Sequence, residues 1–125
     1  ADANKSHSFS YTTDCAKGLG LLSKSNEAFN QTWHLPTYNP ALDGKTFIEL
    51  VAKELKVAPN YSVLKTWMVK MGGFFNQTIH ESYEMLYQNE FDYHFDSSKF
   101  NDFFDYKPKS YQEGIHDTIE FIKKK

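Results

Sequence analysis

The sequence has one cysteine, no excess of positive charge and no long apolar run, and each of these features would otherwise indicate a class of protein. Its single cysteine, Cys15, excludes an internal disulfide and cannot alone form a thiolate zinc site, which favours a reducing, cytoplasmic setting. Its net charge of −2 lacks the basic balance of a nucleic-acid partner. No apolar run approaches a membrane span, and no signal-like core opens the chain, so we expect neither nucleic acid nor membrane as a partner.

Aromatic residues, by contrast, are abundant: 11 Phe, 8 Tyr and 2 Trp in 125 residues. Most aromatic side chains fill cores, but an excess in a small domain can also mark apolar surface that receives a partner or ligand. The length allows one domain at most. The chain starts with Ala1 and a polar, irregular stretch, so we treat residues 1–125 as a single domain or a fragment of a longer chain.

Short strands alternating with helices predict an α/β fold. Three capping boxes, Thr46–Glu49, Thr78–Glu81 and Ser110–Glu113, mark helix starts. The expected strands are His7–Tyr11, Gln31–Leu35, Tyr61–Leu64 and Phe91–Phe95. The expected helices are Thr13–Leu22, Thr46–Leu55, Trp67–Met71, one after Thr78, one from Asp96 or Ser97 through Phe103, and one after Ser110.

The stretch "FDYHFDSSKF" places Asp92, His94 and Asp96 two residues apart, on one face of a strand. Such a face could hold a metal or an acid/base pair. The alternative is a half-buried strand whose aromatic residues point inward while the polar residues meet water. Because nothing nearby supplies further ligands or a second shell, we predict no metal site and expect Asp96 to cap the following helix.

The last third, "FDSSKFNDFFDYKPKSYQEGIHDTIEFIKKK", resembles the end of an extended short-chain dehydrogenase/reductase, the family of NAD-dependent epimerases and dehydratases. "YTTDCAKGL", with Thr13, Asp14 and Ala16, is similar to the family's helix start, and "QTWHLPT" to a strand that follows it. The resemblance covers nearly the whole chain, but only the second half of a family member. The chain departs from the family at Asp105–Pro108, which replaces a glycine-containing turn, and at Gln112.

The resemblance implies the substrate-binding, C-terminal part of a Rossmann-type oxidoreductase or isomerase whose parent uses NAD or NADP. This chain has no Gly-x-x-Gly-x-x-Gly turn, so we expect it to bind no cofactor and to be inactive by itself. Tyr61 and Lys65 match the family's Tyr-x-x-x-Lys spacing. That motif belongs on a helix, whereas these residues follow Pro59-Asn60 in a predicted strand, so we assign no catalytic residue.

The nominated substrate-binding residues are Thr37 and Tyr38, just past the predicted Gln31–Leu35 strand, and Tyr83 and Tyr87 on a later helix. The substrate would be a small molecule, with a sugar-like compound as one option. Two other hypotheses stay open: a self-sufficient, non-catalytic binding module with an aromatic pocket, and a metal-dependent enzyme using the three residues of the strand face.

The same resemblance also predicts that the chain associates with a second copy. The Gln31–Leu35 strand would normally pair with strands of the other half of the parent. Its unpaired backbone groups would be a template for a second chain, so we expect a homodimer or a swapped assembly.

Overall fold

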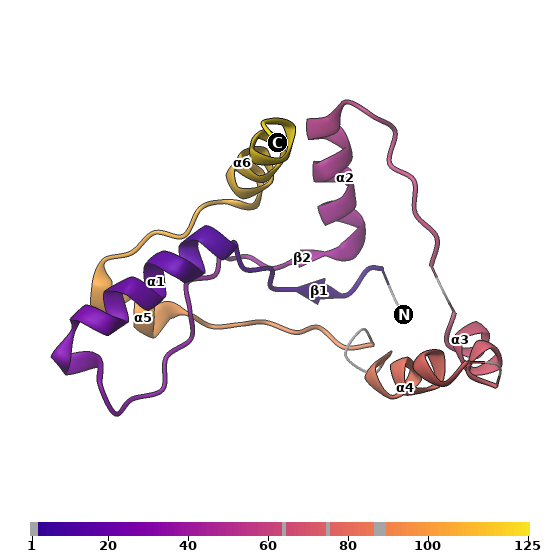
Figure 1. Ribbon diagram of the computed structural model, residues 1–125, viewed down its shortest axis with the longest axis horizontal. Helices are drawn as coiled ribbons and strands as arrows, with labels where there is room; N and C mark the ends of the chain where they lie inside the picture. The colour runs from indigo at the N-terminus through magenta and orange to yellow at the C-terminus, as the bar shows by residue number, and fades with distance from the viewer. Residues whose placement is uncertain (1–2, 64, 75, 87–89) are drawn as a thin grey trace.

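The structure is a computed structural model that describes residues 3–63, 65–74, 76–86 and 90–125. Three pairs of helices lie at the corners of an open triangle and are joined by extended segments: α1 with α5, α2 with α6, and α3 with α4 (Figure 1). The elements in chain order are β1 Ser6–His7, α1 Thr12–Lys24, a 3-10 turn Asn26–Ala28, β2 Leu42–Asp43, α2 Gly44–Leu55, α3 Thr66–Gly73, α4 Gln77–Met85, α5 Ser98–Phe104 and α6 Tyr111–Lys123.

The sheet is much smaller than the sequence predicted. Strands β1 and β2 pair antiparallel, with Ser6 opposite Asp43 and His7 opposite Leu42. Tyr93 adds one isolated parallel bridge to His7, through hydrogen bonds from its N–H to Ser6 and from Ser8 to its carbonyl. The described part of the chain is therefore a helix-rich domain with one two-stranded sheet, which agrees with a small mixed fold.

The predicted strand Gln31–Leu35 is wrong, because side chains from α5 occupy the backbone groups around it. Lys99 Nζ donates to the carbonyl of Thr32 at 3.1 Å, and the Ser97 hydroxyl accepts from the N–H of Thr37 and donates to its carbonyl. The Trp33 ring packs against the phenylalanines of α5. The segment is irregular and pairs with no strand of the described residues, whereas the predicted dimer was to form through a strand.

The other strand predictions fail in similar ways. The predicted strand Phe91–Phe95 forms only the bridge at Tyr93, and two of its three aromatic rings do not face inward: Phe91 is 67% exposed and Tyr93 59%, whereas Phe95 is half-buried. Residues 61–63 are irregular, and residue 64 lies outside the described residues. Without a neighbouring ladder to bury one face, alternating aromatic and polar residues do not produce a strand.

The helices were predicted more accurately than their caps. The capping box Ser110–Glu113 is confirmed: the Ser110 hydroxyl accepts from the N–H of Glu113, whose carboxylate accepts from the N–H of Ser110. Helix α2, however, is capped three residues earlier than predicted, by Asp43. Helix α4 is capped by Asn76. Asp and Asn accept from the first-turn N–H groups as well as Ser and Thr do, so they took the role predicted for the threonines.

Helix α1 packs closely against Pro36 and against Phe100 of α5, and this contact holds the α1 and α5 pair together. Phe100 of α5 is fully buried, and its ring lies against Trp33 and Phe104. Helix α1 approaches this cluster at Gly18, where an added Cβ would lie 2.8 Å from Cδ of Pro36 and 3.3 Å from the Phe100 ring. Gly18 is therefore required for close packing rather than for an unusual backbone angle.

Replacing the two glycines of α1 with alanine should have opposite effects. Gly20→Ala meets nothing within 4 Å and should raise the free energy of unfolding by up to about 1 kcal/mol, because alanine is the better helix former. Gly18→Ala should lower it, by about 1 kcal/mol or more, because the added methyl overlaps the rigid ring of Pro36. Urea denaturation of both variants measures this, and equal stabilisation of both would show that Gly18 has room.

Candidate binding groove

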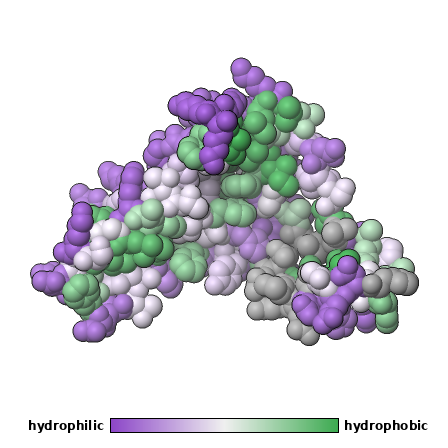
Figure 2. Space-filling view, viewed as in Figure 1, coloured by the Kyte–Doolittle hydropathy of each residue, from purple (hydrophilic) through white to green (hydrophobic). Residues whose placement is uncertain are grey.

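An apolar groove of about 800 Å³ lies between α2, α6 and the extended segment 8–12. Hydrophobic side chains gather over the α2 and α6 region of the surface (Figure 2). The walls come from Val51 and Leu55 on α2 and from Ile115, Ile119 and Ile122 on α6. The volume falls in the range of pockets that bind small organic molecules, roughly 300–1,000 Å³.

Five aromatic rings line the groove, and four of them hold one another in place. Phe9 stacks on Phe47 with ring centroids 4.5 Å apart, and the Tyr111 ring meets both Phe9 and Tyr38 edge-on. The Tyr111 hydroxyl donates to the carbonyl of Tyr38 at 3.0 Å and lies 3.5 Å from the N–H of Phe9. Burial raises the pKa of Tyr111, so its hydroxyl stays protonated as this donor. Rings fixed in this way give a preformed surface.

The sequence builds the groove from two helical stripes. Phe47, Val51 and Leu55 recur every four residues on α2, so all three share one face. Ile115, Ile119 and Ile122 are four and three residues apart on α6, so they too share one face. The two stripes face each other because α2 and α6 pack together. The capping side chains Asp43 and Ser110 fix where each helix begins, and thereby which residues reach the groove.

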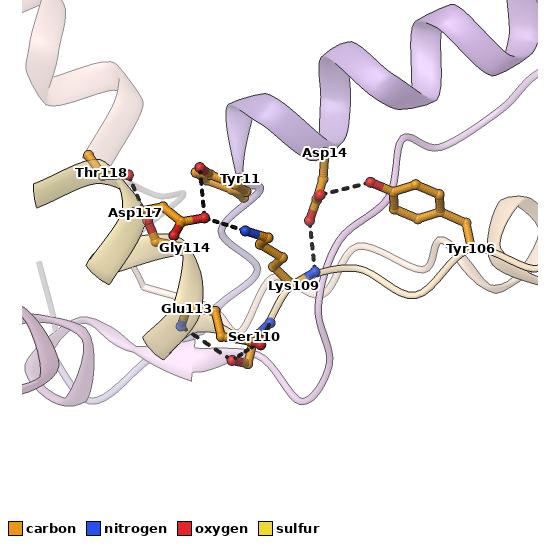
Figure 3. A network of polar contacts seen from close by, with 9 residues as sticks. All are labelled: Tyr11, Asp14, Tyr106, Lys109, Ser110, Glu113, Gly114, Asp117 and Thr118. Carbon is orange, nitrogen blue, oxygen red and sulfur yellow. Dashed lines mark hydrogen bonds and ion pairs between the residues drawn. The ribbon is translucent and has the colours of Figure 1, made fainter. Parts of the chain in front are cut away.

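A buried carboxylate beside the groove holds its walls together. Asp14, in the first turn of α1, is 2% exposed and accepts two hydrogen bonds: from the Tyr106 hydroxyl and from the N–H of Lys109, both at 2.8 Å (Figure 3). A helix N-terminus also favours a negative charge at this position. Burial, together with the hydrogen bond to Asp14, raises the pKa of Tyr106 to about 12, so this phenol remains a donor at neutral pH.

An ion pair closes one end of the groove. The Lys109 ammonium is hydrogen-bonded to the carboxylate of Asp117, which also accepts from the Tyr11 hydroxyl at 3.4 Å (Figure 3). The hydrogen bond raises the pKa of Lys109 and lowers that of Asp117. Both groups are therefore charged at neutral pH and neutralise each other.

A second ion pair joins the two wall helices outside the groove lining. His116 Nδ1 on α6 lies 2.8 Å from Glu54 Oε1 on α2. The hydrogen bond to Glu54 raises the pKa of His116. Because the folded chain holds this proton more tightly, the pair's contribution is fully present below the ordinary histidine pKa and is lost as the pH rises through the raised value.

Two kinds of reactive site would be recognisable among the described residues: a nucleophilic thiol and a metal cluster. Cys15 is on α1, and burial raises its pKa, which disfavours the thiolate that a nucleophile requires. Within the part of the chain that the structure describes, no three His, Cys, Asp or Glu side chains lie together as a metal site would require. Asp92 instead accepts from the N–H of Ser6, and Asp96 from that of Ser98.

The structure does not bring the nominated substrate residues together. Tyr38 lies in the groove. Thr37 is buried next to it, with its hydroxyl bonded to Ser10 and to the carbonyl of Leu35. Tyr83 lines a separate cavity of about 120 Å³ between α3 and α4, and Tyr87 lies outside the described residues.

The sequence reasoning missed most of the groove. Phe9, Tyr11, Phe47, Lys109 and Tyr111 were not nominated, although all line it. The four-residue spacing of Phe47, Val51 and Leu55 was a usable signal, but the prediction used that helix for no site. Tyr61 and Lys65 do not share a helix face, since residue 61 is irregular and Lys65 is the N-cap of α3.

Comparison with protein family models, curated proteins and solved structures finds no match to this chain. The groove's role therefore has to be argued from its own residues.

Replacing the buried carboxylate should be costly. Asp14→Asn keeps the size of the side chain but turns an NH₂ group toward one of two donors, so we expect the free energy of unfolding to fall by about 1–3 kcal/mol. Asp102→Asn, at an exposed position on α5, is the matched control and should change it by less than about 0.5 kcal/mol. Urea denaturation measures both. Equal changes in the free energy of unfolding of the two variants would mean that the two hydrogen bonds of Asp14 contribute nothing to stability.

Removing the partner of His116 should lower its pKa toward the ordinary value. We expect this for Glu54→Gln, because the amide keeps an acceptor but loses the charge. Glu49→Gln, whose carboxylate pairs with Lys45 instead, should leave the pKa of His116 unchanged. NMR titration of the imidazole protons, assigned with His116→Gln, measures both. An unchanged pKa in Glu54→Gln would contradict the contact between α2 and α6.

Proposed function

We propose that this chain is the substrate-binding, C-terminal part of an NAD(P)-dependent epimerase/dehydratase-like enzyme, and that the groove is its small-molecule site. One observation carries the proposal: the three segments on which the family resemblance rests are the ones that pack together around buried polar groups.

The contacts between these segments are specific. Asp14 of "YTTDCAKGL" binds Tyr106 and Lys109 of the C-terminal third. Thr37 of "QTWHLPT" exchanges two hydrogen bonds with Ser97, which is fully buried. The first and second segments meet where Gly18 approaches Pro36. Each segment thus contacts both of the others, and the polar residues of the motifs make two of the three contacts.

The proposal assigns the cofactor to the rest of the parent. A dinucleotide requires backbone N–H groups free to hold its pyrophosphate, usually at a glycine-rich turn from a strand into a helix. Here the first turn of α1 contains the carboxylate of Asp14, and the N-terminus of α2 is capped by Asp43. Negative charges at both helix starts do not suit a phosphate. We therefore derive no reaction step in this chain, whose role is to bind and orient substrate.

The groove also favours a second candidate, a self-sufficient binding module without catalytic activity. Its aromatic rings are fixed by contacts within the chain, so the site is formed without another half. The two candidates share the site and differ in whether another half is needed for the reaction. Thr37, Tyr38, Tyr83 and Tyr87 stay predictions under both.

Two further parts of the proposal concern the oligomeric state of the chain and its location in the cell. Leu55 and Ile122, at the groove, and Phe121 beside them are exposed, so a homodimer stays a proposal that now rests on apolar surface rather than on a strand edge. The single cysteine supports a cytoplasmic location. No helix in the described ranges has the length and apolar character needed to cross a membrane.

The decisive experiment compares this chain with its parent. Calorimetric titration of the chain with NAD and NADP should show no micromolar binding, whereas a parent that carries a glycine-rich turn upstream should bind one of them. In that parent, Tyr61→Phe and Lys65→Ala should leave turnover largely unchanged. Micromolar binding by this chain alone, or loss of turnover by several orders of magnitude with folding preserved, would contradict the proposal. A start codon directly before Ala1 would favour the module.

A further inference from the structure

The polar side chains that line the groove are nearly all engaged with the protein itself. The hydroxyls with protein partners are those of Ser8, Ser10, Tyr11, Ser110, Tyr111 and Thr118. Among the lining residues, which all lie within the described ranges, only Thr12 and Tyr38 have hydroxyls without a protein partner. A ligand with many hydrogen-bonding groups would therefore find few free partners here.

The charges in the lining are likewise neutralised. Lys109 pairs with Asp117, and Lys123 bonds to Glu120 at 3.1 Å. Asp14 is buried behind its two donors. A phosphate or carboxylate on the ligand would share its lysine with a carboxylate that already neutralises the ammonium, and a cation would meet two acids that already have partners. A charged ligand thus gains little from this lining to offset the water it loses.

The remaining surface suits flat rings. The rings of Phe9, Phe47, Tyr38 and Tyr111 meet one another stacked or edge-on and lie next to the aliphatic residues of the walls. A stacked or edge-on arrangement with such rings stabilises an aromatic or fused-ring ligand beyond the burial of its area.

We propose that the groove binds an uncharged, largely apolar, ring-bearing small molecule. This rests on the proposed function for the role of the site and deepens it by naming the substrate class. It also replaces the sugar-like option, because a sugar would present many hydroxyls to a lining with few free partners. The occupant is a small molecule rather than a second chain, since the site is concave and its volume matches such ligands.

The test uses two fluorescent probes that share the same rings and differ in charge. N-phenyl-naphthylamine is neutral, and anilinonaphthalene sulfonate carries an anion. We expect saturable binding of the neutral probe at one site per chain, at least tenfold tighter than the sulfonate, and no heat on titration with UDP-glucose. Equal or tighter binding of the sulfonate, or binding of UDP-glucose, would overturn the inference.

A matched pair of variants localises the probe. Leu55→Lys places a charge at the groove mouth, where Leu55 is 46% exposed, and should weaken the neutral probe at least tenfold. Leu19→Lys, on α1 and 58% exposed, lies outside the groove and should change binding less than twofold. Equal effects would place the probe elsewhere. Both side chains are exposed, and circular dichroism checks that each variant is folded.

Light scattering in parallel separates a small ligand from a second copy. Affinity for the probe should not depend on chain concentration. If it falls as the chain associates, and Leu55→Lys restores a monomer, a second copy occupies the groove and the inference is wrong. None of these results bears on NAD binding, so the inference can fail while the proposed function stands, and the reverse.

Discussion

The buried carboxylate of Asp14 is the interaction on which the rest of the structure depends. It joins the first turn of α1 to the loop before α6, and the direction in which that loop leaves Asp14 decides where α6 lies. Helix α6 supplies one wall of the groove and, through Tyr111, fixes two of its aromatic rings. A charge in this position is tolerated only because Tyr106 and the backbone of Lys109 both donate to it, since a buried carboxylate without donors would cost several kcal/mol.

Local signals in the sequence predicted the helices well, because a helix closes its hydrogen bonds within its own segment. The stripe of Ile115, Ile119 and Ile122 and the box Ser110–Glu113 located α6 correctly. A strand is stabilised by hydrogen bonds to a neighbouring strand, and the local sequence does not identify that neighbour. Gln31–Leu35 and Phe91–Phe95 have the composition of strands, yet the first is bonded by side chains of α5 and the second contributes one bridge.

The candidate site was predictable only in part for the same reason. Tyr38 was found by its place after a supposed strand and does lie in the groove. Phe9 and Tyr111 are 102 residues apart in the chain but are joined by a hydrogen bond. Periodicity within one segment does not predict a contact of this range. Asp14 was noticed through the family resemblance, but its burial and its two donors depend on tertiary packing.

The separation of 95 residues between Asp14 and Lys109 has a consequence for how the chain acquires its structure. The hydrogen bonds of Asp14 can form only after the chain between it and Lys109 has been brought together. Contacts of such long range slow folding, since the entropy of closing the loop must be overcome before they form. Helices α2 and α4 can form from local interactions, whereas the groove also needs these long-range contacts and is therefore completed late in folding.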